Sequence, residues 1–321
     1  MNSLIATILN EKAGLDEFLK SIQGQSMPPD EIVIVDGGST DGSWEFLQEK
    51  ESELKNLKVF RESGNIAHGR NFAIRKSSGQ LIVVADAGCR YDKDWFKKIT
   101  APFEDKSVTW AATGFGPWLE KNDNFNTLEI AAATIPQKNE FNKLWLPSSR
   151  SVAFYKDRWQ TAGGYPEWIP YCEDVLFDLK LVRKEGQPFF VREVLVHWRP
   201  RTSLGKYFRQ LFNYTRSEGH AHLNTHRNYA RFAAYIALVA CLFYRTTQTY
   251  YLLPILAGGA VIYMLKYWQR FRSFSLERSV LIRYGGLVVL PLYIFYGDLA
   301  KMLGYLYGSA ERALGTISEN N

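Results

Sequence analysis

Cysteine is scarce in the sequence, and an N-terminal leader pattern is missing. The 321 residues include three cysteines, Cys89, Cys172 and Cys241, and no two of them share a CxxC spacing. This number and spacing exclude a disulfide framework and a cysteine-based zinc site, so we expect a reducing compartment. The first residues contain no basic stretch followed by an apolar run, as a secretory signal peptide would. We therefore expect the chain to begin on the cytoplasmic side.

Acidic residues are scarce in the last third of the chain. Residues 199–321 carry 15 Lys and Arg but only 5 Asp and Glu, whereas residues 1–198 carry 24 and 28. The basic part also contains two long apolar runs, 232–265 and 280–297. Nucleic-acid surfaces need basic residues without such runs. We therefore expect a membrane as partner and no nucleic acid.

The apolar runs predict a C-terminal helical membrane region over residues 226–321. A span needs about 20 apolar residues, so 232–265 suits a hairpin that turns near Arg245. Basic residues flank this hairpin on both ends, which places both flanks in the cytoplasm by the positive-inside rule. Whether a third segment, 284–296, also spans stays open. So does the alternative that these runs are buried helices of a soluble domain.

A different pattern fills the first 200 residues, where short apolar runs alternate with helical periodicity. Strands are predicted at 4–9, 31–35, 57–60 and 81–85, with helices between them. Further strands near 108–113 and 151–154 and a helix over 175–184 follow. This alternation predicts an α/β fold, a mostly parallel sheet flanked by helices, in a catalytic domain of residues 1–225. The looser segment 116–146 is expected to cover a substrate.

Polar residues follow three of the predicted strands. The carboxyl ends of parallel strands share one edge of the sheet, and ligands bind in the crevice there. A GxGxxG motif is absent between the first strand and the first helix, which argues against a dinucleotide-binding dehydrogenase. Two carboxylates suit a nucleotide sugar with a divalent ion near its diphosphate, although each is equally typical of a turn. The strand-end residues are Thr7, Asn10, Glu11, Asp36, Gly38 and Asp86.

Five motifs in order give the chain a family resemblance. They are Thr7-Ile-Leu-Asn-Glu, Val35-Asp-Gly-Gly-Ser-Thr-Asp-Gly, Gly69-Arg-Asn-Phe-Ala, Ala85-Asp-Ala-Gly and Cys172-Glu-Asp. On these motifs residues 3–222 resemble the family 2 glycosyltransferases, with the GT-A fold, of the membrane-associated type that builds polysaccharides or lipid-linked glycans. The resemblance implies inverting, hexosyltransferase-type transfer from a nucleotide diphosphate sugar to a lipid-linked saccharide at the cytoplasmic face of the inner membrane.

Two alternatives remain open beside this function. One is a polyprenyl-phosphate sugar synthase, whose acceptor is the lipid phosphate itself. The other is a catalytically inactive scaffold subunit of a membrane complex that assembles glycans. Gly37 and Gly88 motivate the second, because they stand where the family usually has acids.

The resemblance also implies roles for single residues in the donor site. Thr7 and Asp36 match positions that hold the nucleotide base, and Arg70 matches a basic residue near the base and phosphates. Asp86 matches the first acid of the DxD motif, which holds ribose and a Mg²⁺ or Mn²⁺ ion. Because Gly88 replaces the second acid, His197 is a candidate second metal ligand. Asn10, Glu11 and Gly38 complete the expected donor site.

Two further sets of residues are expected to serve the acceptor. Asp174 is the expected general base for the acceptor hydroxyl, and Glu173 beside it caps or orients the helix start. A basic amphipathic segment follows the catalytic domain, and it resembles one that offers phosphate contacts or else lies at the membrane surface. It lacks the QxxRW motif of processive synthases, so we expect one sugar per encounter. Its expected acceptor and phosphate contacts are Arg199, Arg209, Gln210 and Arg216.

Overall fold

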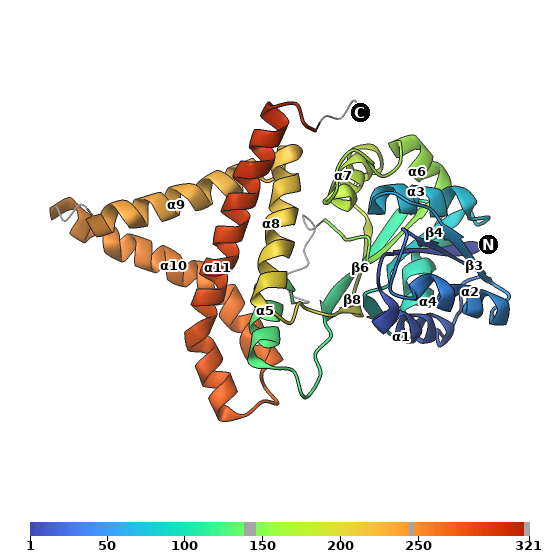
Figure 1. Ribbon diagram of the computed structural model, residues 1–321, viewed down its shortest axis with the longest axis horizontal. Helices are drawn as coiled ribbons and strands as arrows, with labels where there is room; N and C mark the ends of the chain where they lie inside the picture. Colours follow the sequence, from blue (N-terminus) through green and yellow to red (C-terminus); the bar gives the residue numbers. More distant parts are fainter. Residues whose placement is uncertain (138–145, 244–246, 318–321) are drawn as a thin grey trace. The chain divides into compact units, whose positions relative to one another are not determined.

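The chain forms two compact units joined by three passages of the backbone. The computed structural model describes residues 1–137, 146–243 and 247–317 (Figure 1). The sheet unit comprises residues 1–118 and 136–199, and the helical unit comprises residues 119–135 and 200–321. The sequence suggested a single boundary near residue 225. The structure instead divides the chain at Arg199 and gives the stretch 119–135 to the helical unit, because that stretch packs against the C-terminal helices.

An eight-stranded mixed sheet forms the centre of the sheet unit, in the order β3-β2-β1-β4-β7-β6-β8-β5. The strands β1 to β4 are parallel to one another, as predicted. Strand β7 is antiparallel to both β4 and β6, and β5 is antiparallel to β8, whereas β6 and β8 are parallel. The bounds are β1 (Asn2–Ile8), β2 (Glu31–Asp36), β3 (Leu57–Arg61), β4 (Leu81–Asp86), β5 (Cys89–Tyr91), β6 (Trp110–Pro117), β7 (Ser151–Tyr155) and β8 (Phe189–Trp198).

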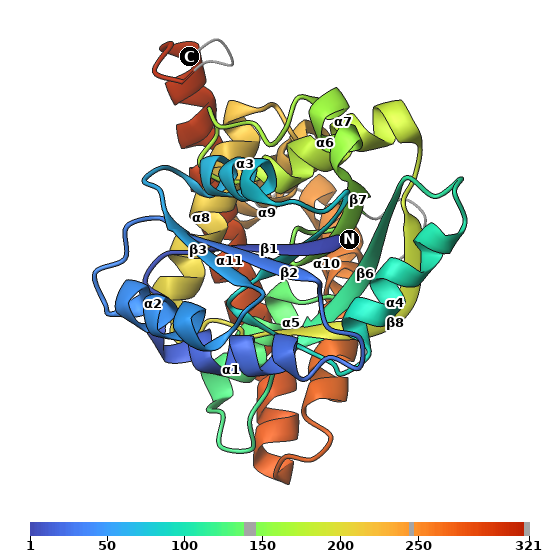
Figure 2. The ribbon, with the colours of Figure 1, turned by 90° about the vertical axis from the view of Figure 1, so that its right-hand side faces the viewer.

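Helices cover both faces of this sheet, with α1, α2 and α4 on one face and α3, α6 and α7 on the other (Figure 1, Figure 2). Helix α1 shows why these segments pack as they do. Its apolar residues Leu15, Phe18, Leu19 and Ile22 recur at helical spacing and are all buried. The bounds are α1 (Lys12–Gln23), α2 (Ser43–Glu53), α3 (Ile66–Lys76), α4 (Trp95–Thr100), the 3₁₀ turn η1 (Ala101–Glu104), α6 (Lys156–Ala162) and α7 (Glu173–Glu185).

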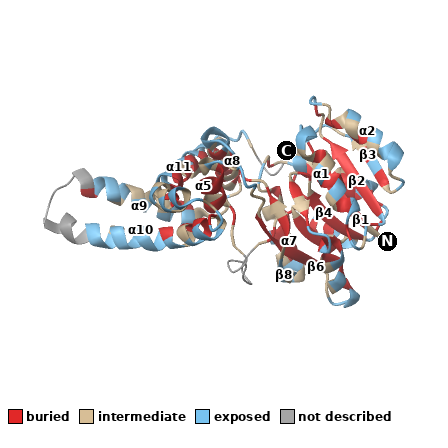
Figure 3. Ribbon diagram, turned by 90° about the horizontal axis from the view of Figure 1, so that it is seen from below, coloured by how far each residue is buried: buried red, intermediate tan, exposed pale blue. Residues whose placement is uncertain are grey.

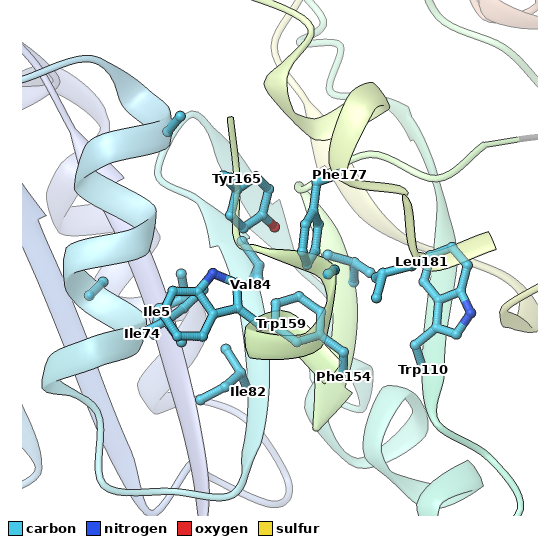
Figure 4. Close-up of a cluster of buried hydrophobic side chains, with 14 of the residues drawn as sticks. Ile5, Ile74, Ile82, Val84, Trp110, Phe154, Trp159, Tyr165, Phe177 and Leu181 are labelled. Atoms are coloured by element: carbon cyan, nitrogen blue, oxygen red, sulfur yellow. The ribbon is translucent and has the colours of Figure 1, made fainter. Parts of the chain in front are cut away.

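A hydrophobic core fixes α7 on the sheet. Phe177 of α7 packs among buried side chains that include Val84 of β4 and Phe154 of β7 (Figure 4). The ring of Tyr165 stacks on Phe177, with the ring centroids 4.2 Å apart. Burying aromatic rings of this size contributes roughly 2 to 3 kcal/mol each to folding. The first turn of α7 is therefore held at a set place in the sheet unit.

The helical unit consists of α5 (Phe125–Thr134), α8 (Leu204–His220), α9 (Thr225–Phe243), α10 (Thr247–Phe274) and α11 (Val280–Ala313). Helices α8 and α11 pack closely because glycine stands at their points of contact. A side chain at Gly308 would overlap the carbonyl oxygen of Arg216, and one at Gly304 would overlap that of Phe212. Helix α5 lies against α10 and α11, where Leu128 packs with Phe271 and Leu290. Side chains are buried where α5, α8 and α11 meet (Figure 3).

Much of the surface of α9, α10 and α11 is apolar. Large apolar side chains such as Ile236, Ile262, Leu281 and Val288 are exposed. Figure 3 shows long exposed stretches on α9 and α10. The run 232–265 forms two helices, as expected of a hairpin, although its predicted turn at Arg245 lies outside the described residues. Among the described residues one helix is long and apolar enough to cross a membrane, and it is α11. That helix contains the third segment, for which the sequence left the question of a span open.

Candidate active site

Three of the predicted donor residues lie side by side at the carboxyl ends of the central strands. The register pairs Thr7 with Asp86 of β4, and pairs the next residue, Ile8, with Asp36 of β2. Gly69 of α3 allows this helix to approach, since a Cβ there would lie 3.0 Å from Cγ2 of Thr7. The structure thus brings together Thr7, Asp36 and Asp86 at one edge of the sheet.

The loops after β1 and β2 are joined by hydrogen bonds between backbone and side chain. The backbone N–H of Asn10 donates to Oγ of Ser39 at 2.8 Å, and the N–H of Thr40 donates back to Oδ1 of Asn10 at 2.9 Å. Asn10 adopts a left-handed conformation with φ of 56°, which asparagine tolerates better than most residues. The N–H of Glu11 donates to Oγ of Ser43 at 3.1 Å. Asn10 and Glu11 therefore help to build this edge of the site.

Asp36 is fully buried and organises the loop that follows it. Its carboxylate accepts from the backbone N–H of Ser39 at 3.1 and 3.2 Å, and Nε of Arg61 lies 3.5 Å from Oδ2. Gly38 within this loop has a φ of 101°, which favours glycine. Because the side chain of Asp36 is shielded from solvent, its contact with a nucleotide base stays a prediction.

Asp86 ends β4 with a carboxylate that is 30% exposed. Its Oδ1 accepts from the backbone N–H of Gly88 at 2.9 Å, and its own N–H donates to the Tyr91 hydroxyl at 2.7 Å. A Cβ at position 88 would lie 3.2 Å from Oδ1, so glycine lets the backbone fold closely over Asp86. Nε of Arg150 lies 3.8 Å from Oδ2. Asp86 therefore has an arginine beside it. Glycine stands at position 88, where the family pattern has a second acid.

Arg70 is buried between α3 and the start of α7, close enough to Asp86 and Asp174 for both charges to raise its pKa. Its guanidinium is buried and donates a hydrogen bond to Oε1 of Glu173, the first residue of α7. Its Cζ also lies 5.4 Å from the ring centroid of Tyr165. Burial raises the pKa of Glu173, and the neighbouring guanidinium opposes that rise. Arg70 thus orients the start of α7, and its contact with donor phosphates stays a prediction.

Asn71, beside Arg70 in the third motif, joins α3 to the turn before α7. Its Oδ1 accepts from the Trp159 indole N–H and from the backbone N–H of Tyr165, both at 2.9 Å. Its Nδ2 donates to the carbonyl of Tyr165 and to Oε1 of Glu167. This motif therefore shapes the scaffold around α7.

Asp174 is the second residue of α7, and its carboxylate is partly exposed. Oδ2 accepts a hydrogen bond from the Ser148 hydroxyl at 3.3 Å. Asp178 lies one turn further along and is fully buried; within the described part of the chain its oxygens have no hydrogen-bond partner. Burial, with the charge of Asp174 nearby, raises the pKa of Asp178 well above its ordinary value. The burial of Asp178 thus disfavours its charged form, and Asp174 is the more exposed carboxylate on this helix.

Asp178 was not among the residues predicted for the site, although its spacing indicates an unusual acid. It stands four residues after Asp174 and next to Phe177, on a helix that buries Phe177 and Leu181. An acid so close to a buried helical face is uncommon and marks a perturbed carboxyl group.

The comparisons with known proteins agree with this geometry. Residues 3–159 match the family model described as glycosyl transferase family 2. The chain carries a family 2 glycosyltransferase domain. It is 23% identical over 225 residues to the O-antigen chain rhamnosyltransferase RfbN of Salmonella typhimurium, covering 64% of this chain and 70% of RfbN. It is 29% identical over 115 residues to the putative teichuronic acid biosynthesis glycosyltransferase TuaG of Bacillus subtilis, covering 35% of this chain and 46% of TuaG.

Solved structures support the GT-A fold. The mannosyltransferase PcManGT of Pyrobaculum calidifontis, solved with GDP-Man and Mn²⁺, superposes with a TM-score of 0.53 at 18% identity. That match covers 98% of this chain and 87% of PcManGT. Residues 1–349 of TarS from S. aureus superpose with a TM-score of 0.50 at 16% identity, covering 98% and 91%. At these identities the likeness shows the fold, and the expected α/β GT-A class is confirmed.

The glycosyltransferase domain offers one carboxylate for a divalent metal. The side chain of Asp86 is 30% exposed at the sheet edge, and its Oδ2 lies 3.8 Å from Nε of Arg150. Nε2 of His197 lies 3.0 Å from Oδ1 of Asp92, so the ring of this candidate ligand is held by another acid. No group of three or more His, Cys, Asp or Glu side chains that could hold a metal is found in the part of the chain described. A metal therefore fits as a contact of Asp86, with the donor and water as further ligands.

The four residues expected at the acceptor are divided between the two units. Arg199, at the end of the sheet unit, donates to the carbonyl of Trp118 at 3.1 Å. The other three lie on α8 in the helical unit: Arg209 is exposed, whereas Gln210 is buried and donates to the Tyr214 hydroxyl. Arg216 forms a bidentate ion pair with Glu311, with Nε 2.6 Å from Oε2. Of the three residues on α8, Arg209 has the guanidinium most open to a phosphate.

Proposed function

We propose that this enzyme is an inverting glycosyltransferase that moves a sugar from a nucleoside diphosphate to a hydroxyl of a lipid-linked saccharide. One observation carries the proposal: a partly exposed carboxylate, Asp174, starts α7 in the same unit whose central strands end at Thr7 and Asp86. The first group suits an acceptor proton, and the second suits a nucleotide sugar. Relatives named for O-antigen and teichuronic acid synthesis support a cell-surface polysaccharide as the product.

The chemistry needs a base and a stabilised leaving group. Asp174 takes the proton of the acceptor hydroxyl while the hydroxyl oxygen attacks C1 of the sugar. The bond from C1 to the diphosphate oxygen breaks with its electron pair on the diphosphate, and the configuration at C1 inverts. The Ser148 hydroxyl donates to one oxygen of Asp174, and the raised pKa of the buried Asp178 disfavours a second charge beside it. Glu173, paired with Arg70, sets the helix start and takes no proton from the acceptor.

A Mg²⁺ or Mn²⁺ ion held by Asp86 would supply further positive charge at the diphosphate. The mannosyltransferase PcManGT, which shares the fold, was solved with GDP-Man and Mn²⁺, and this supports the assignment. Asp86 itself orients the donor, because its carboxylate is fixed by the N–H of Gly88 and still partly exposed.

The proposed location is the cytoplasmic face of the inner membrane. The apolar exposed surface of α9 to α11 and the span candidate α11 support membrane association. The excess of Lys and Arg after residue 198 supports attraction to anionic lipid headgroups. Such an anchor would keep a lipid-linked acceptor at high local concentration.

A donor screen tests the function directly. The full chain in lipid nanodiscs is incubated with UDP-, GDP- and dTDP-sugars, Mn²⁺ and a bacterial lipid extract, with Asp174→Asn as the inactive control. We expect one donor to label a lipid-linked saccharide, with wild type at least about 100-fold faster than the variant. Labelling of a polyprenyl phosphate at equal rates by both proteins would instead identify a polyprenyl-phosphate sugar synthase. Absence of transfer and of nucleotide binding would favour the scaffold.

A further inference from the structure

We propose that Arg150 is the chain's own cation at the leaving diphosphate, and that it fixes the general base Asp174 through Ser148. The proposal rests on the proposed glycosyl transfer and adds to it a residue that no motif of the sequence marked. Arg150 directly precedes β7, the strand that pairs with β4, and Asp86 is the last residue of β4.

The side chain of Arg150 is held in place by two aromatic rings. Its Cζ lies 4.1 Å from the ring centroid of Trp198 and 5.3 Å from that of Phe115. The backbone is fixed as well, because the Tyr91 hydroxyl donates to the carbonyl of Arg150 at 2.9 Å and accepts from the N–H of Asp86 at 2.7 Å. The side chain is only 15% exposed. A guanidinium fixed in this way needs little rearrangement to act on a substrate.

The guanidinium of Arg150 contacts the donor-side acid and also the serine that binds the proposed general base. Nε of Arg150 lies 3.8 Å from Oδ2 of the donor-side acid Asp86. Nη1 donates to Oγ of Ser148 at 2.7 Å, and that hydroxyl donates to Oδ2 of Asp174 at 3.3 Å. Arg70, the basic residue that the motifs placed near the donor, donates its hydrogen bond to Glu173. Arg150 forms the ion pair with Asp86.

The position matches the charge that develops during transfer. As the bond from C1 to the diphosphate oxygen breaks, the leaving group gains one negative charge. A planar guanidinium with several N–H donors binds phosphate oxygens well, and its plane can stack on an aromatic ring. Lysine keeps the charge but lacks both the planar fork and the stacked surface. Arg150 would act together with a metal held by Asp86, since both supply positive charge to the same group.

The link to Asp174 follows from the single proton of a hydroxyl group. Because Ser148 accepts from Nη1 of Arg150, its own proton is directed at the carboxylate of Asp174. Loss of Arg150 frees the hydroxyl to turn, so the base loses its orientation.

The test compares Arg150→Met and Arg150→Lys with Arg158→Met. Arg158 of α6 pairs with Glu185 and lies outside the site, so its variant controls for the loss of a partly exposed arginine. Calorimetry with UDP and GDP, at fixed Mn²⁺ and on the full chain in nanodiscs, measures binding. We expect about tenfold weaker binding or more for Arg150→Met, and no change for Arg158→Met. Turnover should fall about 10²- to 10³-fold in Arg150→Met and less in Arg150→Lys.

A second readout separates positioning from general damage. Ser148→Ala should lower kcat and leave the calorimetric affinity for the nucleotide unchanged, because it removes the hydrogen bond to Asp174 and keeps the guanidinium of Arg150. A merely structural loss would weaken nucleotide binding and kcat together in Ser148→Ala. If Arg150→Met does not fold, Arg150→Lys decides, since it keeps the charge and most of the volume.

The outcomes are distinct from those of the proposed function. Wild-type binding of UDP or GDP together with unchanged binding and turnover in the Arg150 variants would overturn the role of Arg150 and leave the function intact. A wild-type protein that binds neither nucleotide and transfers no sugar would contradict the proposed function itself.

Discussion

Arg70 on α3 and Glu173 at the start of α7 form a buried ion pair across 103 residues of sequence. The two helices lie on the same face of the sheet (Figure 2). The ion pair sets the distance between them at the first turn of α7, which carries Asp174. The motif containing Arg70 thus contributes to the site through the scaffold.

The first prediction concerns the stability supplied by this pair. Arg70→Met leaves the carboxylate of Glu173 buried without its cation, which should lower the free energy of unfolding by about 3 to 5 kcal/mol. The double variant Arg70→Met with Glu173→Gln should recover much of that loss. Urea unfolding of the three proteins measures the effect, and Arg75→Met on the same helix serves as control. A single variant as stable as wild type would contradict the prediction.

Asp174→Asn keeps the shape of the base and removes its basicity. Turnover should fall about 10²- to 10⁴-fold, equivalent to roughly 3 to 5 kcal/mol in activation free energy, while donor affinity stays unchanged. Asp157→Asn, also in the first turn of a helix but 61% exposed, is the matched control and should behave as wild type. Steady-state kinetics measures the turnover, and calorimetry measures the affinity for the donor. Full activity of Asp174→Asn at neutral pH would assign the base elsewhere.

Asp86→Ala should act on the donor. Losing a charged contact of 1.5 to 3 kcal/mol corresponds to about 10- to 100-fold weaker binding of a nucleotide sugar. Turnover should fall as well, because the diphosphate loses its position. Asp105→Ala, in the turn before β6, is the control. Normal donor affinity in Asp86→Ala would show that this carboxylate holds neither ribose nor metal.

Glu129 on α5 makes the helical unit sensitive to pH. It is buried, and burial raises its pKa from 4.5 to about 8. When an acid is harder to ionise in the folded state, the folded protein loses stability as the pH rises from the acid's unfolded pKa to its folded pKa. The stability of the unit should therefore decline between about pH 4.5 and 8, by up to about 5 kcal/mol.

Glu129→Gln should remove this decline. The variant should melt higher than wild type at pH 8 and close to wild type at pH 5, as followed by thermal unfolding in one buffer series. Glu277→Gln, at an exposed position of the same unit, should melt like wild type at both pH values. Equal pH dependence in wild type and Glu129→Gln would contradict the assignment.

Two glycines of α11, one in close contact with α8 and one with no neighbour at its Cβ position, test how tightly these helices pack. A methyl group at Gly308 would overlap the carbonyl of Arg216, so Gly308→Ala should destabilise the protein by about 1 to 3 kcal/mol. A Cβ at Gly285 meets nothing within 4 Å, and alanine there should stabilise the helix by up to about 1 kcal/mol. Thermal unfolding in nanodiscs compares them. The same sign for both substitutions would mean that α8 does not pack tightly on α11.

The sequence predicted the first half of the sheet unit well, because each strand and helix there carries its own local pattern. β1 to β4 and the helices between them follow from apolar runs and from periodicity such as that of Leu15, Phe18 and Ile22. Strand β5 spans three residues, too few to show a period. Helix α5 was missed because its apolar residues find their partners about 140 residues later, on α10.

The residues of the site likewise fall into those that local patterns predict and those that depend on partners distant in the sequence. Thr7, Asp36 and Asp86 could be placed together because strand ends of a parallel sheet meet at one edge. The pairing of Arg70 with Glu173 could not be predicted, since the two residues are distant in sequence and no local pattern joins them. Arg150 and Ser148 belong to no motif; their role depends on aromatic rings contributed by β6 and β8.

The three passages of the backbone between the units mean that the helical unit is no detachable anchor. Cutting the chain after residue 199 would remove α8, α10 and α11 but leave α5 behind, with Leu128, Ile130 and Ala132 stripped of their packing partners. A shortened, soluble form of this enzyme would therefore have to replace residues 119–135 together with the C-terminal helices. Gain or loss of the membrane-associated part during evolution would likewise require two coordinated changes in the gene.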